Sequence, residues 1–193
     1  MKKLKHNIFP YVLFAIIVIL AIFTFKEYID EFKKINNENI TDILTENEYK
    51  VDGFTKATVK RVVDGDTIIV IIDNKEYRVR LIGVNSPEST TTIEEYGKEA
   101  SSYTSSKLTG KTVYLEKDVS ETDKYGRLLR YVWIDLPSHY NENEIKTKMF
   151  NSILVINGYA QAATYPPDVK YSNYFKDFQK IARDKNIGLW KYE

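Results

Sequence analysis

Four short segments of the sequence carry side chains that can bind a cation or a phosphate and move a proton. Asp64-Gly65-Asp66-Thr67 and Asn85-Ser86-Pro87-Glu88 together offer carboxylate, amide and hydroxyl oxygens. Oxygen ligands of this kind suit a hard divalent cation. The other two segments supply guanidinium groups, at Arg80 and within Asp123-Lys124-Tyr125-Gly126-Arg127. A guanidinium is the side chain best suited to bidentate binding of phosphate.

Together these groups can support hydrolysis of a phosphodiester bond. A cation positions phosphate and neutralises its charge, a carboxylate accepts a proton from water, and guanidinium groups stabilise charge on the phosphate oxygens. Singly, each segment has a plainer interpretation, because Asp-Gly is a common turn pair, Ser-Pro often begins a helix and a lone arginine is often a surface charge. His6 and His139 form no catalytic set with a serine, and His139 follows Pro137 in a segment typical of a surface loop.

The elements that must position these segments begin with three strands. β-Branched and apolar residues at 57–63, 67–72 and 77–82 predict an antiparallel meander, joined by turns at 64–66 and 73–75. The two turns are rich in aspartate, asparagine and glycine, as tight connections require.

Later segments predict two more strands and three helices. The strands are expected at 112–116 and 128–134, and the helices at 94–108, 149–156 and 171–185. Five strands with a leading meander predict an α+β fold that is mainly a β barrel, a five-stranded Greek-key barrel of the OB type with about three helices.

The N-terminal segment favours a membrane location. Residues 8–25 carry no charge, and Lys2, Lys3 and Lys5 precede them. About 18 helical residues span close to the hydrocarbon thickness of a bilayer. We therefore expect residues 1–25 to form one transmembrane anchor, with the lysines cytoplasmic and the rest of the chain extracellular. A cleaved signal, which would release a secreted protein, is the alternative.

Charge divides the chain into three parts. Segments 1–25, 26–54 and 55–193 carry net charges of +3, −4 and +2, and the chain has no cysteine. Residues 26–54 are interpreted as a polar acidic tether, and residues 55–193 as the folded domain. The absence of cysteine excludes disulfides, thiolate metal sites and a thiol nucleophile. Since the domain is only weakly basic, the sequence predicts modest, salt-sensitive affinity for nucleic acid without base-sequence readout.

The ordered set of motifs resembles the thermonuclease (staphylococcal nuclease-like) family. The resemblance covers about residues 55–190 and rests on five pieces in family order: Val63-Asp64-Gly65-Asp66-Thr67, Arg80-Leu81-Ile82-Gly83-Val84-Asn85-Ser86-Pro87-Glu88, Tyr96-Gly97-Lys98-Glu99-Ala100, Thr122-Asp123-Lys124-Tyr125-Gly126-Arg127 and Asn157-Gly158-Tyr159-Ala160.

The resemblance implies a five-stranded OB barrel and Ca²⁺-dependent cleavage of DNA and RNA that leaves 3′-phosphates. By position, the family's catalytic residues correspond to Arg80, Glu88 as general base, and Arg127. Its calcium ligands correspond to Asp66, Asn85 and the carbonyl of Ser86, and its substrate contacts to Lys124 and Tyr125, with Tyr165 a candidate for stacking on a base. A monomer is expected.

Two departures from the family pattern matter. Asn85 stands where the family archetype has aspartate, so one negative charge is lost and weaker calcium affinity is expected. Residues 162–166 match only loosely where the archetype places tyrosines around the nucleotide. Two alternatives therefore stay open beside a nuclease: a non-catalytic OB module that binds nucleic acid or protein, and a membrane-anchored structural protein whose apparent site is only a set of turns.

Overall fold

The computed structural model of the chain describes residues 25–31, 33–34, 50–51, 53–90 and 93–192. Two compact units are present, Met1–Asn47 and Glu48–Glu193. In the first unit, residues 25–31 and 33–34 are helical. Among the described residues, no helix combines the length and the apolar character needed to cross a membrane. The expected anchor at 8–25 lies, apart from Phe25, outside the described residues.

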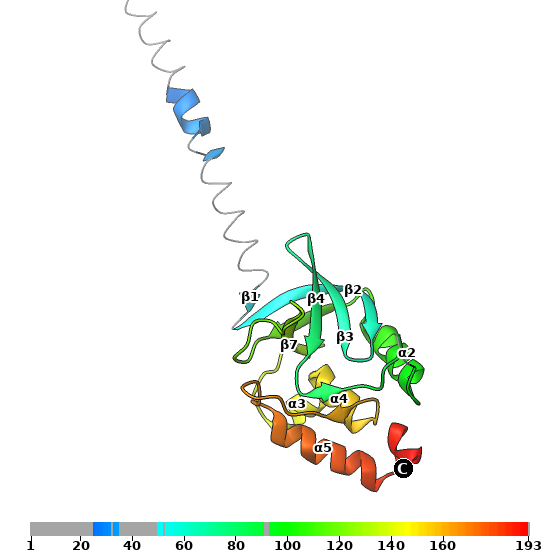
Figure 1. Cartoon of the computed structure of the whole chain (residues 1–193). Helices are drawn as coiled ribbons and strands as arrows, with labels where there is room; N and C mark the ends of the chain where they lie inside the picture. The colour runs from blue at the N-terminus through cyan, green and yellow to red at the C-terminus, as the bar shows by residue number, and fades with distance from the viewer. Residues whose placement is uncertain (1–24, 32, 35–49, 52, 91–92, 193) are drawn as a thin grey trace, which may run out of the picture. The chain divides into compact units, whose positions relative to one another are not determined.

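Five strands of the second unit form a closed barrel (Figure 1). They are β2 (Phe54–Asp64), β3 (Thr67–Ile72), β4 (Lys75–Leu81), β6 (Thr112–Glu116) and β7 (Leu128–Trp133). Their order is β2-β3-β4-β7-β6, and β2 also pairs with β6, so the sheet closes on itself. The β4–β7 pair is parallel and the other pairs are antiparallel. The five-stranded barrel expected from the sequence is confirmed.

The strands differ from their predicted bounds mainly at their ends. β4 begins at Lys75 rather than residue 77, because Asp73 and Asn74 form a two-residue turn with φ angles of 48° and 60°. Both positive φ values match the tight turn whose twist suits a hairpin. The short β1 (Lys50–Val51) pairs with the start of β2, so strand pairing begins inside the segment interpreted as a tether.

The helices are α2 (Gly97–Leu108), α3 (Glu142–Lys148), α4 (Phe150–Ile156) and α5 (Ser172–Asp184), followed by the 3₁₀ helix η1 (Gly188–Tyr192). Figure 1 shows α3, α4 and α5 gathered on one side of the barrel, with α2 packed separately. The three predicted helices are confirmed in type. The prediction missed α3, whose start is marked by the Asn141 side chain accepting a hydrogen bond from the amide of Glu144.

The predicted start of the first helix at residue 94 is wrong. Tyr96 has a left-handed backbone with φ of 68°, so α2 begins at Gly97. The rings of Tyr96 and Tyr103 both stack on Tyr159, with centroids 5.7 Å and 3.9 Å away. These contacts attach α2 to the segment that follows α4.

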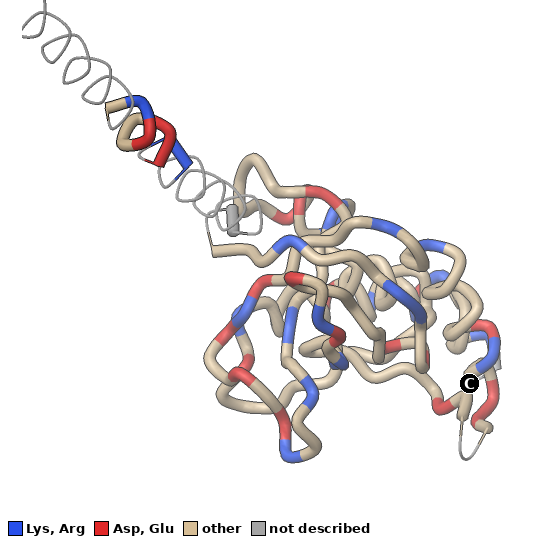
Figure 2. Tube along the Cα trace, turned by 90° about the horizontal axis from the view of Figure 1, so that it is seen from above, with Lys and Arg blue, Asp and Glu red and all other residues tan. Residues whose placement is uncertain are grey.

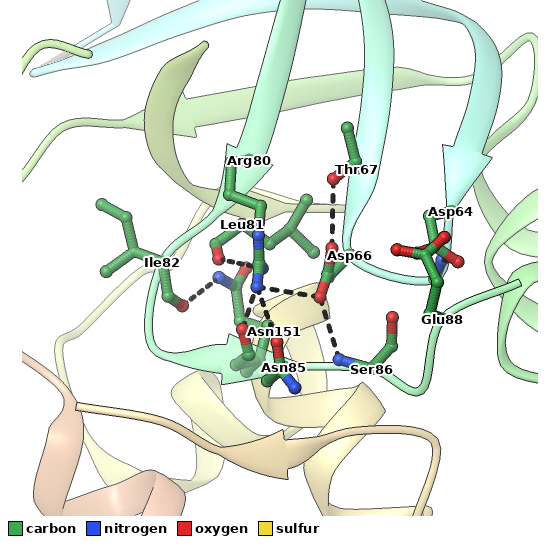
Figure 3. A network of polar contacts seen from close by, with 12 residues as sticks. Asp64, Asp66, Thr67, Arg80, Leu81, Ile82, Asn85, Ser86, Glu88 and Asn151 are labelled. Carbon is green, nitrogen blue, oxygen red and sulfur yellow. Dashed lines mark hydrogen bonds and ion pairs between the residues drawn. The ribbon is translucent and has the colours of Figure 1, made fainter. Parts of the chain in front are cut away.

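The buried Asn151 of α4 fixes the chain where it leaves β4. Its side chain is fully buried, its Oδ1 accepts a hydrogen bond from the amide of Val132 at 2.8 Å, and its Nδ2 donates to the carbonyl of Ile82 at 2.8 Å (Figure 3). Just beyond, β5 (Val84–Asn85) pairs with β8 (Gln161–Ala162). The path of residues 82–85 is thus set by contacts from distant parts of the chain.

Replacing Asn151 by alanine should destabilise the domain by about 2–5 kcal/mol, because a buried amide and a buried carbonyl each lose their partner. Urea unfolding followed by circular dichroism measures the change. Asn157→Ala is the matched control, since the side chain of Asn157 is exposed and donates its hydrogen bond to the carbonyl of Ile153 at the surface. Equal destabilisation by the two variants would contradict this role for Asn151.

Candidate active site

Arg80 is held rigidly on β4 by contacts on both sides of its guanidinium (Figure 3). Its Nη1 donates to the carbonyls of Leu81 at 3.0 Å and Val84 at 2.8 Å. Its Nη2 donates to Oδ1 of Asn85 at 3.1 Å and forms an ion pair with Asp66 Oδ2 at 3.0 Å. Since the side chain is only 14% exposed, Arg80 presents a fixed positive charge rather than a mobile one.

Asp66 lies in the turn between β2 and β3. Its carboxylate connects Arg80 to the segment that contains Ser86. Its Oδ1 accepts from the hydroxyl of Thr67 at 3.0 Å, and its Oδ2 accepts from the amide of Ser86 at 2.9 Å. Gly65 beside it is packed so closely that a Cβ there would lie 2.6 Å from Ser86 Oγ. The turn and the segment after β5 are therefore in direct contact.

A polar cavity of about 240 Å³ opens beside this contact. It brings together all six residues that the sequence indicated for catalysis and for metal binding. The cavity is lined by Val63, Asp64, Asp66, Thr67, Arg78, Arg80, Asn85, Ser86, Glu88, Thr90 and Arg127. Carboxylates and guanidinium groups thus face the same small space.

Asp64 adds a further carboxylate to the cavity. Its Oδ1 accepts hydrogen bonds from the amide of Gly65 at 2.8 Å and from the hydroxyl of Ser89 at 2.6 Å. Burial raises the pKa of Asp64, the nearby carboxylates of Asp66 and Glu88 raise it further, and the two hydrogen bonds oppose the shift without cancelling it. The carboxylates of Asp64, Asp66 and Glu88 are therefore close enough to repel one another.

Glu88 is positioned through its backbone. Its amide donates to Oε2 of Glu94 at 2.9 Å, and its carbonyl accepts from the amide of Glu94 at 2.8 Å. A Cβ at Gly97, the first residue of α2, would lie 2.2 Å from that carbonyl, so only glycine fits there. The side-chain Oε1 accepts from the amide of Thr90 at 2.9 Å and from the Thr90 hydroxyl. The carboxylate is thereby oriented as well as placed.

Arg127 is oriented by Asp123, a residue whose role the sequence did not reveal. Its Nε donates to Asp123 Oδ2 at 2.6 Å, while the amides of Arg127 and Tyr125 donate to Oδ1 at 3.0 Å and 2.9 Å. Burial alone would raise the pKa of Asp123, but these hydrogen bonds and the Arg127 charge outweigh it and lower the pKa. Among the described residues, the Nη groups of Arg127 make no hydrogen bond, so they are available to phosphate oxygens.

A second, wider cavity of about 580 Å³ adjoins the first, because Arg80 and Arg127 line both. The residues indicated for substrate contact all line it: Lys124, Tyr125 and Tyr165. Tyr125 is 72% exposed and Tyr165 is 63% exposed. Their rings are therefore accessible to a base, and the two arginines lie where the two cavities adjoin.

Asp168 lines the wider cavity as well, and nothing in the sequence marked it. It is buried, and its Oδ1 accepts from the amides of Val119 at 3.0 Å and Ser120 at 2.8 Å. Burial would raise the pKa of Asp168, but the hydrogen bonds from Ser120 and Val119 lower it overall. Since Asp168 also pairs with Tyr165 through a short β-bridge, it positions the segment that presents Tyr165.

The oxygen atoms around the smaller cavity fit a hard cation. The hydroxyl of Ser86 is buried and has no hydrogen-bond partner among the residues that the structure describes, and Ser86 lines the cavity together with Asp66, Asn85 and Glu88. Such a donor set is what calcium prefers. The described residues contain no group of three or more histidine, cysteine, aspartate or glutamate residues arranged to hold a metal. A cation here would rely on amide, hydroxyl and carbonyl oxygens in addition to carboxylates.

The chain is similar in sequence to one family model and to several known proteins. A family model described as "Staphylococcal nuclease homologue" matches residues 78–192. "Thermonuclease" from Staphylococcus intermedius is 37% identical over 194 aligned positions, covering 99% of this chain and 99% of that protein. "Thermonuclease" from Staphylococcus hyicus is 42% identical over 135 positions, covering 68% and 73%. "Micrococcal nuclease" from Shigella flexneri is 33% identical over 140 positions, covering 70% and 73%.

Asp123→Asn should lower the stability of the domain at neutral pH and misplace Arg127. Because the folded state depresses the pKa of Asp123 below its ordinary value of 3.8, its contribution to stability is present above that value and is lost as the pH falls through the folded pKa. The difference in urea midpoint between wild type and variant should therefore shrink as the pH is lowered from 7 to below about 4.

Asp177→Asn, on an exposed site of α5, is the control and should show no such pH-dependent difference. A constant gap between wild type and Asp123→Asn across the whole range would mean that ionised Asp123 is not what stabilises this loop.

Proposed function

The chain belongs to the staphylococcal nuclease homologues and is a nuclease hydrolase, and from that premise we propose that it cleaves DNA and RNA with calcium, without base-sequence readout, leaving 3′-phosphates. One observation carries the proposal: Arg80, Arg127 and Glu88 line a single cavity together with a set of oxygen ligands. The arrangement combines phosphate binding, proton acceptance and cation binding in one place.

The two arginines have different parts in this proposal. Arg80 is fixed by four protein contacts and acts as a preorganised positive charge beside the scissile phosphate. Arg127 is held through Nε, so its Nη groups are directed to equatorial phosphate oxygens as charge develops on them. Asp123 keeps Arg127 in this orientation without blocking it.

Glu88 accepts the proton of the attacking water. The water oxygen forms a new bond to phosphorus while the bond to the 5′ oxygen breaks, and the phosphate stays on the 3′ side. The 5′ oxygen takes up a proton and leaves as a hydroxyl. Thr90 orients the Glu88 carboxylate, and Gly97 sets the position of its backbone. General-base assistance of this kind contributes typically about 10²–10⁴-fold to rate.

Calcium would be held by the Asp66 carboxylate, the Asn85 amide oxygen and the Ser86 carbonyl oxygen. When bound, it supplies Lewis-acid polarisation and charge neutralisation at the phosphate. Asn85 Oδ1 also accepts a hydrogen bond from Arg80, and Asp66 pairs with the same arginine. These residues therefore bring the cation and the fixed guanidinium to the same phosphate.

The distribution of surface charge supports binding of nucleic acid by a few positioned side chains rather than by a large basic surface. In Figure 2, Lys and Arg positions alternate with Asp and Glu along the trace, without one large basic region. Lys124 lies 5.0 Å from the Tyr125 ring centroid, and Arg127 lies 5.4 Å from it. A base stacked on Tyr125 would place its phosphates beside both cations.

Glu88→Gln and Arg127→Ala should each lower kcat by about 10²–10³-fold, since one removes the base and the other removes charge stabilisation. The measurement is degradation of plasmid DNA and of RNA by the full-length chain in detergent, with calcium and with chelator. Glu142→Gln, an exposed change on α3, is the matched control.

Calcium should also raise the unfolding temperature of the wild type, and the increase should be smaller in Asp66→Asn. Phosphatase sensitivity of the labelled products identifies 3′-phosphates. Full activity in chelator, or wild-type rates in both site variants, would contradict the mechanism. Saturable binding of oligonucleotide without cleavage under any divalent ion would favour a non-catalytic OB module.

We propose further that residues 8–25 anchor a monomeric enzyme in the cell membrane with the nuclease domain outside the cell. The uncharged run and the lysines before it support this location. Protease added to intact cells should remove the domain while a membrane-bound N-terminal fragment remains. Recovery of the full activity in the medium, with a shortened N-terminus, would instead show cleavage and secretion.

A further inference from the structure

Arg78 has no function in the site described so far, although it lines the same cavity as the proposed catalytic residues. The chain has six arginines in a lysine-rich composition. Four of them are already accounted for: Arg80 and Arg127 in the site, Arg130 in an ion pair with Glu121, and Arg183 over the ring of Trp190 at 4.1 Å. The remaining two are Arg61 and Arg78.

Arg78 precedes Arg80 by two positions on β4, so both side chains leave the same face of the strand. The separation of their backbones is about 6.6 Å. Val79 between them is fully buried, whereas Arg78 is exposed. Within the described part of the chain, Arg78 forms no ion pair. Unlike Arg80, whose guanidinium is occupied by protein contacts, it is available to a ligand.

Arg61 continues the line of positive charge across the barrel wall. In the sheet register, Arg61 of β2 and Arg78 of β4 both lie opposite Ile69 of β3. Ile68 and Val70 point into the core and are fully buried, so Ile69 and its two arginine neighbours are on the outer face. Two strand spacings put Arg61 about 10 Å from Arg78.

The line of positive charge formed by Arg78 and Arg61 does not continue toward the start of β4. Glu76, two positions before Arg78 on the same face, forms an ion pair with Lys60. The charges of that pair cancel, whereas Arg78 and Arg61 form no ion pair with any residue that the structure describes. A polyanion that left this cavity along the β3–β4 face would pass these two guanidinium groups.

We propose that Arg78 forms a second phosphate subsite, which binds the phosphate next to the scissile one in the same nucleic-acid strand, with Arg61 as the following contact. The subsite rests on the proposed nuclease function. It predicts a preference among substrates of that nuclease. Substrates with a second phosphate bind more tightly than a minimal diester, because the planar guanidinium can make two hydrogen bonds to it.

The first test is binding without cleavage. Affinity of a short fluorescent single-stranded DNA is measured over a range of salt concentrations in the Glu88→Gln background, with the DNA checked to be intact afterwards. Adding Arg78→Ala should weaken binding about tenfold and should reduce the slope of log K against log salt by about 0.7, the value for one phosphate contact. Arg78→Lys should keep the slope and recover only part of the affinity.

The control is Lys75→Ala, which removes an equal charge from the far end of β4, outside the cavity. It should leave both affinity and slope close to those of the parent. If Arg78→Ala behaves like Lys75→Ala, then Arg78 is an ordinary surface charge and the subsite is wrong. Thermal unfolding of each variant confirms that the fold is retained.

The second test is kinetic, on otherwise wild-type protein. Arg78→Ala should raise KM for an oligonucleotide far more than it changes kcat, and the KM effect should be absent for a diester with a single phosphate. Equal losses on both substrates would place Arg78 at the reacting phosphate and overturn the subsite. If the wild type cleaves neither substrate while the salt slope still falls in Arg78→Ala, the proposed catalysis fails and the subsite remains as a binding site.

Discussion

The ion pair between Asp66 and Arg80 is the contact on which the rest of the site depends. It joins the β2–β3 turn to the end of β4 at 3.0 Å, and the same Asp66 oxygen accepts the amide of Ser86 at 2.9 Å. Both charged groups are largely excluded from water. Removing either partner would leave the other as an uncompensated buried charge, which costs about 3–5 kcal/mol. Three segments are thus held in one arrangement by a pair that we also propose to take part in catalysis.

The barrel makes this pair possible because its closure brings distant segments to one edge. Thr67 and Arg80 are paired residues on neighbouring strands, so the first turn and the end of β4 meet there. The parallel pairing of β4 with β7 then places Leu129 beside Arg80. The loop before β7, which contains Arg127, therefore reaches the same cavity. Of the groups proposed for catalysis, Arg80 lies on β4 itself, and Glu88 and Arg127 lie in loops that adjoin strands.

Close backbone packing and buried polar contacts fix the positions of the other residues of the site. Gly65 and Gly97 allow approaches that any side chain would block, one against Ser86 and the other against the carbonyl of Glu88. Asn151 satisfies the carbonyl of Ile82 at the exit from β4 and the amide of Val132 in β7. These contacts hold the segment between β4 and α2 in one path, which is what keeps Asn85 and Glu88 facing the cavity. Preorganisation of this kind reduces the reorganisation needed when charge develops on a substrate.

Local sequence determined the strands, the turns and most of the helices, because alternation of apolar residues and turn chemistry act over a few residues. It also identified the candidate residues, since motif spacing needs no knowledge of neighbours. Long-range packing decided what local patterns do not contain. The left-handed Tyr96 shortens the predicted helix, and Asp123 and Asp168 hold the loops of the site. Whether an arginine is occupied, as Arg80 is, or available, as Arg78 is, depends on partners brought near by barrel closure, which is why only the tertiary structure separates the two.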